Sequence, residues 1–324
     1  MSAMPTGRSV RRPLEPFKFR APEVTATGAE RAFVELSRLE TLWFNTGTLC
    51  NVECLRCYID SSPTNDRLAY LTCGEVERYL DELAALDSGT REIGFTGGEP
   101  FMNPAFPAML EECLARGFDV LVLTNAMQPM MRPAVRSGLL RLREAHGDRL
   151  HLRVSLDHYT PELHEKERGA RSWAAALRGL RWLADNGLRW SVAGRTCWRE
   201  PEGELRDGYA RLFAVEGLAL DAHDPAALVL FPEMDAALDV PEITVDCWQI
   251  LGVEPSAVMC ATSRMVVKRR GATAPTVVTC TLLPYDPRFE LGPALRDALG
   301  PVRLNHPHCA RFCVLGGASC SVVA

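Results

Sequence analysis

TLWFNTGTLCNVECLRCY, residues 41–58, is the stretch from which the fold can be inferred. Its first five residues are mostly apolar and end at a polar loop, which is typical of a buried β-strand. The loop then places three cysteines, Cys50, Cys54 and Cys57, at spacings of three and two intervening residues. The stretch therefore predicts a buried strand that carries a group of thiols at its carboxyl end.

Similar apolar runs recur along the chain, and amphipathic helical stretches separate them. The predicted strands are residues 41–45, 92–96, 120–124, 150–156, 189–193 and 228–231, and the predicted helices are residues 74–86, 107–116, 133–144, 172–186 and 204–215. Thr72 and Glu75 form a capping box at the first helix, and Gly117 and Gly187 follow two others as stops. This alternation predicts an α/β fold with a parallel sheet, either open or closed into a barrel, whose ligands gather at the carboxyl ends of the strands.

The three thiols of the first loop have no obvious fourth partner. No histidine lies nearby, and the next cysteine, Cys73, falls at a predicted helix start. Structural zinc requires four ligands, whereas a [4Fe–4S] cluster on three thiolates leaves one iron open to a substrate or cofactor. Clustered thiols in a reducing compartment favour metal binding or redox catalysis over disulfides.

Motifs at the ends of the predicted strands are similar to those of one enzyme superfamily. Cys50-x3-Cys54-x2-Cys57 is followed by Gly97-Gly98-Glu99-Pro100, Thr124-Asn125-Ala126, Ser155-Leu156-Asp157 and Glu167-Arg168-Gly169. In this order they resemble the radical S-adenosylmethionine (radical SAM) superfamily over residues 41–231. The resemblance implies a partial (β/α)6 TIM-type barrel, a [4Fe–4S] cluster held by Cys50, Cys54 and Cys57, and S-adenosylmethionine (SAM) bound at the open iron.

The resemblance also implies which residues contact SAM. In the family, the motif that matches Gly97, Gly98 and Glu99 holds the methionine amino group; glycines allow close backbone approach and a carboxylate accepts a hydrogen bond from an ammonium group. The other residues implied to bind the cofactor are Tyr58, Asn125, Ser155, Asp157 and Arg195. The family usually has an aromatic residue before the third cysteine. Arg56 stands there instead, and we expect Tyr58 to pack against the adenine.

A second group of cysteines lies toward the C-terminus. Cys260 and Cys280 flank two β-rich runs, residues 264–270 and 276–279, whose pairing in a hairpin would bring both thiols to its open end. Cys309 and Cys313 follow after a loop and a predicted helix. Four thiols at these spacings suit either a structural zinc ion or an iron–sulfur cluster.

The second group resembles the twitch or SPASM extensions of radical SAM enzymes. That resemblance implies one auxiliary [4Fe–4S] cluster on Cys260, Cys280, Cys309 and Cys313, with Cys320 as the alternative fourth ligand. The three-residue gap between Cys309 and Cys313 departs from the commoner gap of two. The expected divisions are an N-terminal arm (1–38), the barrel (39–231), a connector with a short helix (232–259) and a β-hairpin-plus-helix iron–sulfur domain (260–324).

Composition narrows the class of protein. Hydrophobic residues make up 47% and charged residues 24% of 324 residues, and the formal net charge is −5. This is ordinary globular composition, and its mildly acidic balance argues against a nucleic-acid-binding protein, since binding to phosphates usually shows as clustered positive charge. The polar, proline-containing residues 1–20 are expected to fray, and no apolar run of ~18 residues predicts a membrane span. We expect a cytoplasmic protein.

Two enzymatic functions follow from the resemblance. The first is the net oxidation of a small metabolite, and the alternative is a peptide or protein maturase that cross-links or oxidises a side chain. Only residues 1–40 precede the first strand, too few for an added peptide-binding domain, which favours the metabolite. A remote alternative is a non-catalytic zinc-binding protein. We expect a one-electron donor such as a flavodoxin or ferredoxin. Cys197, after the fifth strand, is a candidate hydrogen-atom donor, a substrate contact or a packing residue.

Overall fold

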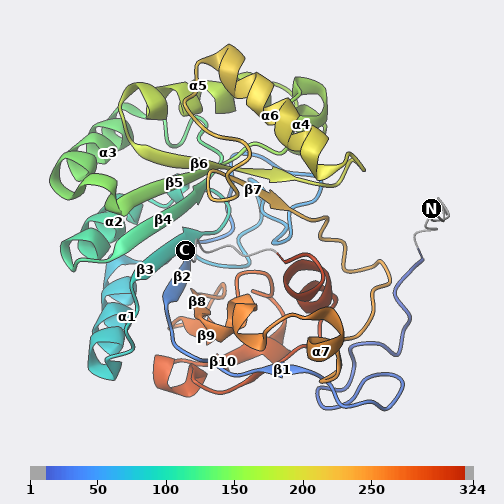
Figure 1. Cartoon of the computed structure of the whole chain (residues 1–324). Coiled ribbons are helices and arrows are strands. Elements are labelled where there is room, and N and C mark those ends of the chain that lie inside the picture. Colours follow the sequence, from blue (N-terminus) through green and yellow to red (C-terminus); the bar gives the residue numbers. More distant parts are fainter. Residues whose placement is uncertain (1–11, 318–324) are drawn as a thin grey trace.

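A mostly parallel sheet forms the centre of the molecule, as shown by a computed structural model that describes residues 12–317 (Figure 1). In the described residues its strands are β2 (Thr41–Asn45), β3 (Glu92–Thr96), β4 (Asp119–Thr124), β5 (Leu150–Ser155), β6 (Arg189–Arg195), β7 (Leu228–Phe231), β8 (Ser263–Val267), β9 (Thr276–Val278) and β10 (Glu290–Gly292). They lie in the order β10-β9-β8-β2-β3-β4-β5-β6-β7, and every pair from β8 to β7 is parallel. The predicted α/β fold class is therefore confirmed.

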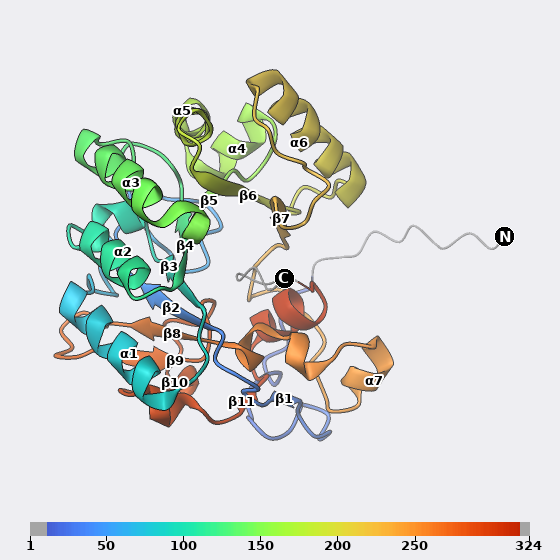
Figure 2. The ribbon, with the colours of Figure 1, turned by 60° about the vertical axis from the view of Figure 1, so that its left-hand side comes forward.

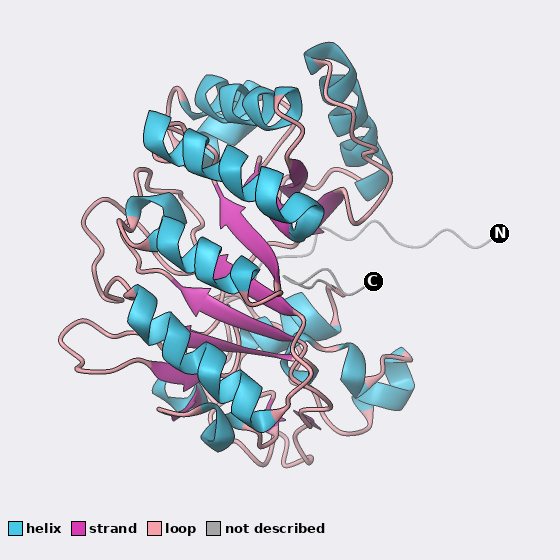
Figure 3. Cartoon of the chain, turned by 90° about the vertical axis from the view of Figure 1, so that its left-hand side faces the viewer, coloured by secondary structure: helices cyan, strands magenta, loops and turns pink. Residues whose placement is uncertain are grey.

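Helices cover the outer face of this sheet (Figure 3). They are α1 (Cys73–Leu86), α2 (Phe106–Ala115), α3 (Pro133–His146), α4 (Pro161–Arg168), α5 (Ser172–Asp185) and α6 (Glu202–Glu216), and a shorter helix α7 (Cys247–Leu251) follows β7. The predicted capping box is present, because the Thr72 side chain accepts from the backbone of Glu75 and the Glu75 side chain accepts from Thr72. Within residues 12–317, no helix has the length and apolar character needed to cross a membrane.

Strand residues alternate between two apolar cores. Leu42 and Phe44 of β2 point toward the helices and join the core between helices and sheet. Trp43, between them, points to the opposite face and joins a second core built with the C-terminal part of the chain. Its ring lies over Gly94, its partner in β3, where any Cβ would collide with it. The strands are therefore covered on both faces, which explains their nearly continuous apolar sequence.

The predicted C-terminal hairpin extends this sheet. β8 pairs in parallel with β2, from Thr41 opposite Ser263 to Phe44 opposite Val266, and β9 and β10 add antiparallel strands beyond it. Figure 2 shows these strands beside β2, with α7 and the red C-terminal helix on the side of the sheet away from α1. The hairpin was expected within a separate small unit. Parallel pairing across a large separation in sequence leaves no local signal, so the sequence did not reveal the junction.

The N-terminal segment is ordered where the structure describes it, contrary to the expected fraying of residues 12–20. The short strand β1 (Phe33–Val34) pairs with β11 (Val302–Arg303), and the buried Arg31 forms an ion pair with Glu242. Phe19 is buried nearby in the second core. Long-range contacts with the connector and the C-terminal segment therefore hold residues 12–38 in place.

Candidate active site

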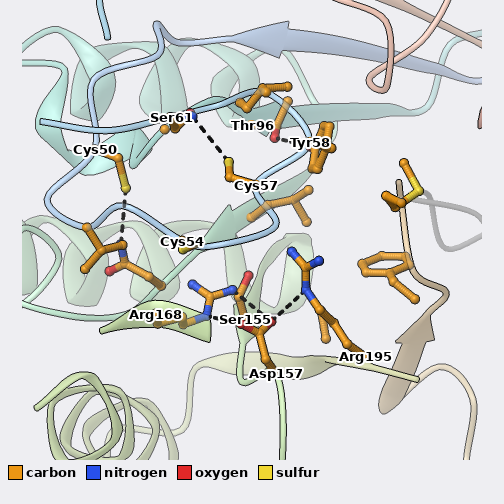
Figure 4. A pocket seen from close by; sticks show the side chains of 18 of the residues that line it. Cys50, Cys54, Cys57, Tyr58, Ser61, Thr96, Ser155, Asp157, Arg168 and Arg195 are labelled. Atoms are coloured by element: carbon orange, nitrogen blue, oxygen red, sulfur yellow. Dashed lines mark hydrogen bonds and ion pairs between the residues drawn. The ribbon is translucent and has the colours of Figure 1, made fainter. Parts of the chain in front are cut away.

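A cavity opens at the carboxyl ends of the parallel strands (Figure 4). Its lining comes from the cysteine loop, from the ends of β3 to β7 and from the C-terminal part of the chain. The predicted site residues that line it are Cys50, Cys54, Cys57, Tyr58, Gly97, Gly98, Asn125, Ser155, Asp157 and Arg195. In Figure 4 the cysteines and Tyr58 occupy one side, and Asp157 and Arg195 face them.

Short-range hydrogen bonds shape the cysteine loop. The backbone N–H of Cys57 donates to the carbonyl of Cys54, and the backbone N–H of Ser61 donates to the Cys57 thiol at 3.3 Å. The Asn125 amide lies 3.9 Å from the Cys50 sulfur. Donors aimed at sulfur are common around iron–sulfur clusters, since hydrogen bonds to the sulfurs tune such centres.

The three thiols suit a group that carries positive charge. Burial raises the pKa of Cys50 to about 12, and it also raises the pKa of Cys54. A raised pKa means that deprotonating these buried thiols costs free energy. Metal-bound thiols are deprotonated, so bound iron would offset that cost. None of the described cysteines is in a disulfide, and no three His, Cys, Asp or Glu side chains in residues 12–317 are gathered as for a single metal ion. Three free thiols on one cavity wall fit a [4Fe–4S] cluster with one open iron.

The Gly-Gly-Glu turn after β3 binds the cysteine loop through backbone hydrogen bonds. The N–H of Gly98 donates to the carbonyl of Gly47 at 2.9 Å, and the N–H of Glu99 donates to that of Leu49 at 3.1 Å. A Cβ on Gly98 would collide with the Leu49 carbonyl, and Gly97 has a φ of +138°. The glycines thus bring the turn against the backbone that precedes Cys50.

Glu99 is buried beneath this turn and does not line the cavity. Its side chain is 1% exposed and accepts hydrogen bonds from the Thr124 hydroxyl at 2.8 Å and the Asn125 N–H at 2.9 Å. Burial raises its pKa to about 7 despite these bonds. In this arrangement the carboxyl group joins the ends of β3 and β4, and its predicted contact with the SAM amino group remains a prediction.

We expect Gly98→Ala to displace the cysteine loop. The added Cβ meets a backbone carbonyl that cannot rotate away, so Cys50 must shift. A displacement of ~1 Å at a catalytic site can cost roughly 10²-fold in rate, and we expect a loss of this order in SAM cleavage. The measurements are iron content and formation of 5′-deoxyadenosine after anaerobic reconstitution.

Gly203→Ala is the matched control for this substitution. Gly203 lies in the first turn of α6, where a Cβ meets nothing within 4 Å. We expect iron content and SAM cleavage equal to those of the parent protein. Unchanged SAM cleavage in Gly98→Ala would show that the close approach is not needed to place the loop.

Asp157 forms ion pairs with two arginines on the cavity wall opposite the thiols. Arg168 contacts it through both Nε, at 2.8 Å, and Nη2, at 3.1 Å, and Arg195 Nε lies 3.2 Å away. Burial alone would raise the pKa of Asp157, but the two positive charges outweigh it and lower the pKa to about 2. Asp157 is therefore ionised at neutral pH and holds both guanidinium groups in fixed positions.

Arg168 is a cavity residue that was not predicted as a site residue. It ends α4, whose polar sequence PELHEKER gave no amphipathic signal, and its guanidinium is largely buried against Asp157. The Glu-Arg-Gly motif at 167–169 was the available signal, because it matched a family pattern without an assigned contact.

The structure also places three other residues that the sequence singled out, Tyr58, Arg56 and Cys197. Tyr58 lines the cavity with its hydroxyl 3.4 Å from the Thr96 hydroxyl, and its expected contact with the adenine remains a prediction. Arg56 does not line the cavity and forms ion pairs with Glu167 and Glu233. Cys197 is 8% exposed and is not among the lining residues, an arrangement that fits the packing role among the three considered for it.

A second, small cavity is lined by the other predicted cysteines that the structure describes. Cys260, Cys280, Cys309 and Cys313 all line it, and apolar side chains make up most of the remaining wall. Cys309 and Cys313 lie within a π-helix (Cys309–Val314) and not after a helix as expected. The wide turn of a π-helix accommodates the three-residue gap between them. Cys320 lies outside the described residues.

The two cavities share part of their walls. Leu282 lines both of them. Phe312, which lies between Cys309 and Cys313 in the π-helix, lines the first cavity and packs against Phe231 with ring centroids 5.5 Å apart. A group held by the second set of thiols would therefore lie directly behind the apolar wall of the first cavity.

Comparison with known proteins identifies the family. The family described as "Radical SAM superfamily" matches residues 44–205, which is half of the chain, and the chain belongs to this superfamily. The chain is 29% identical over 172 residues to the antilisterial bacteriocin subtilosin biosynthesis protein AlbA of Bacillus subtilis, covering 51% of this chain and 36% of AlbA. It is 30% identical over 158 residues to the mycofactocin maturase MftC of Mycobacterium ulcerans, covering 49% of this chain and 40% of MftC. The chain thus spans less than half the length of these relatives.

Solved structures support the same fold. The structure of SuiB from Streptococcus suis with bound S-adenosylmethionine aligns with a TM-score of 0.58 at 12% identity, covering 80% of this chain and 64% of SuiB. This likeness confirms the predicted partial TIM-type barrel. The superfamily implies a [4Fe–4S] cluster and SAM as cofactors, and the residues predicted to bind them, Glu99 excepted, line the first cavity.

Proposed function

We propose that the protein is a radical SAM maturase that oxidises or cross-links a side chain of a peptide, assisted by one auxiliary [4Fe–4S] cluster. The observation that carries this proposal is the pair of cysteine-lined cavities with a common wall. A [4Fe–4S] cluster bound by four thiols has no open iron. It can exchange electrons but cannot bind a substrate. A cluster placed beside the substrate cavity suits a net oxidation.

A peptide substrate is favoured over the small metabolite expected from the sequence. AlbA is named for bacteriocin biosynthesis and MftC as a maturase, and SuiB has been solved with its precursor peptide SuiA. The apolar wall of the first cavity supports the same choice, because it can hold an amino-acid side chain. Its members are Leu123, Phe231, Pro232, Met234, Leu282 and Phe312.

The chain's own residues prepare the first cavity for this chemistry. When bound, the [4Fe–4S] cluster and SAM supply a 5′-deoxyadenosyl radical that removes a hydrogen atom from the substrate. Asp157 fixes Arg195 and Arg168 as positive groups, and we assign Arg195 to the SAM carboxylate. Tyr58 covers the adenine, and the apolar wall excludes water and stray hydrogen donors from the reacting centre.

The test is anaerobic reconstitution followed by two substrate panels. We expect about eight irons per chain, SAM cleavage that depends on a one-electron donor such as a flavodoxin or ferredoxin, and a peptide product that has lost two hydrogen atoms. Synthetic peptides with varied side chains form one panel and small metabolites form the other, both followed by mass spectrometry. Oxidation of a metabolite with every peptide unchanged would reject the maturase assignment. Binding of zinc without iron would reject radical chemistry altogether.

We further propose that the protein works in the cytoplasm and that residues 260–324 form its auxiliary-cluster domain. The reducing cytoplasm keeps clustered cysteines available for metal binding, as the free thiols of both cavities require. The described part of that domain contributes both strands of the hairpin and the π-helix.

A further inference from the structure

His308 and Thr279 are polar side chains in the wall of the second cavity. The other described residues that line this cavity are apolar or carry sulfur. His308 lies directly before Cys309, is 6% exposed, and its backbone N–H donates to Nδ1 of His306 at 3.1 Å. The Nδ1 atom of His308 is buried and has no hydrogen-bond partner within residues 12–317. The ring thus lines the thiol cavity with an unpaired nitrogen.

An unpaired buried nitrogen indicates a partner supplied from outside the chain. Leaving such a group unsatisfied costs ~1–3 kcal/mol, and buried polar atoms in native proteins nearly always have a partner. The cavity wall offers this nitrogen the Thr279 hydroxyl, thiols and apolar side chains, and within residues 12–317 it is hydrogen-bonded to none of them. A neutral imidazole carries one N–H, which can donate to a sulfur acceptor.

We propose that His308 donates a hydrogen bond from Nδ1 to a sulfur of the auxiliary cluster and thereby raises the reduction potential of that cluster. This proposal rests on the auxiliary cluster of the proposed function. Cys260, Cys280, Cys309 and Cys313 already provide four ligands, so the imidazole acts as a donor to the cluster and not as a ligand. Reduction adds negative charge to the sulfurs, and a hydrogen bond stabilises the charged form more strongly. His308 is thus a tuning residue for an electron acceptor.

Two substitutions separate the donor from the shape of the side chain. His308→Leu fills the same space without an N–H, whereas His308→Asn places an amide N–H close to the position of Nδ1. Each is introduced into the full chain that also carries alanine at Cys50, Cys54 and Cys57, so that the auxiliary cluster is the iron centre measured. Iron content is determined first, and the midpoint potential is then measured by an anaerobic redox titration followed by electron paramagnetic resonance.

We expect about four irons in all three proteins and a more negative potential in His308→Leu. Loss of one hydrogen bond should lower the ratio of reduced to oxidised cluster at a fixed potential about tenfold, which corresponds to 59 mV for one electron. His308→Asn should stay near the parent value. Equal potentials in His308→Leu and the parent would overturn the proposal, as would an equal shift in both variants. Absence of iron from the parent background would instead reject the auxiliary cluster itself.

Isotope labelling tests the same contact without a substitution at His308. In protein labelled with ¹⁵N-histidine, pulsed electron paramagnetic resonance of the reduced cluster should show a weak nitrogen coupling through the hydrogen bond. This measurement decides the question even if His308→Leu fails to bind iron. A strong coupling would identify a directly bound nitrogen, and no coupling would identify no contact; either result contradicts the donor assignment.

Discussion

Replacing Cys50, Cys54 and Cys57 together by alanine abolishes SAM cleavage and leaves about four irons per reconstituted chain. This is the largest effect that we expect, because the three thiols line the first cavity and are the ligands proposed for the first cluster. Among the described residues that line this cavity, no other cysteine and no histidine is present to replace them. Iron counting and 5′-deoxyadenosine formation under anaerobic conditions provide the measurement.

The matched control replaces thiols that lie outside both cavities. Cys73, at the start of α1, and Cys247, at the start of α7, are partly buried and line neither cavity. The double variant Cys73→Ala/Cys247→Ala should retain about eight irons and full SAM cleavage. The assignment of the first cluster fails if the triple variant cleaves SAM at the parent rate.

Replacing Cys280 and Cys309 by alanine should separate SAM cleavage from product formation. Both thiols are buried in the second cavity, and their loss leaves two ligands for the auxiliary cluster. We expect about four irons, continued SAM cleavage, and peptide product reduced to background, because the electron from the oxidised substrate then has no acceptor. The quantities to compare are 5′-deoxyadenosine and oxidised peptide formed in the same reaction.

SAM cleavage at the first cavity is the internal control for this variant. The cysteines of this cavity lie on the first loop, Asp157 follows β5 and Arg195 ends β6, whereas the substituted thiols line the second cavity and not the first. SAM cleavage therefore reports whether the variant has folded. A full yield of oxidised peptide without the second set of thiols would remove the auxiliary cluster from the mechanism.

The sequence predicted local structure well because short-range chemistry determines it. Residues 41–45, 92–96 and 228–231 were predicted with the bounds that the structure shows, since each is an apolar run that ends at polar residues. The helix at α1 followed from its capping box. The gathering of cofactor-binding residues followed from parallel strands, whose carboxyl ends meet at one edge.

The remaining features depend on partners distant in sequence. An arginine such as Arg31 is expected at the surface from its residue type. It is buried here in an ion pair with Glu242, which lies more than two hundred positions away in the sequence. The parallel pairing of β8 with β2 has no turn that would signal it. Arg168 belongs to a helix too polar to be recognised by periodicity, and the burial of Glu99 depends on the end of β4. Position in the fold, and not residue type, decided each of these cases.

The hydrogen-bonded junction of β2 and β8 limits how such a protein can be shortened or recombined. Removal of everything after residue 259 would take away one of the two neighbours of β2, and the backbone donors and acceptors that face β8 would be left unpaired in the middle of the molecule. Unpaired strands attract other chains and aggregate. Exchange of the C-terminal segment between homologous proteins should therefore transfer β8, β9 and β10 together, because a splice point between barrel and hairpin falls inside one sheet.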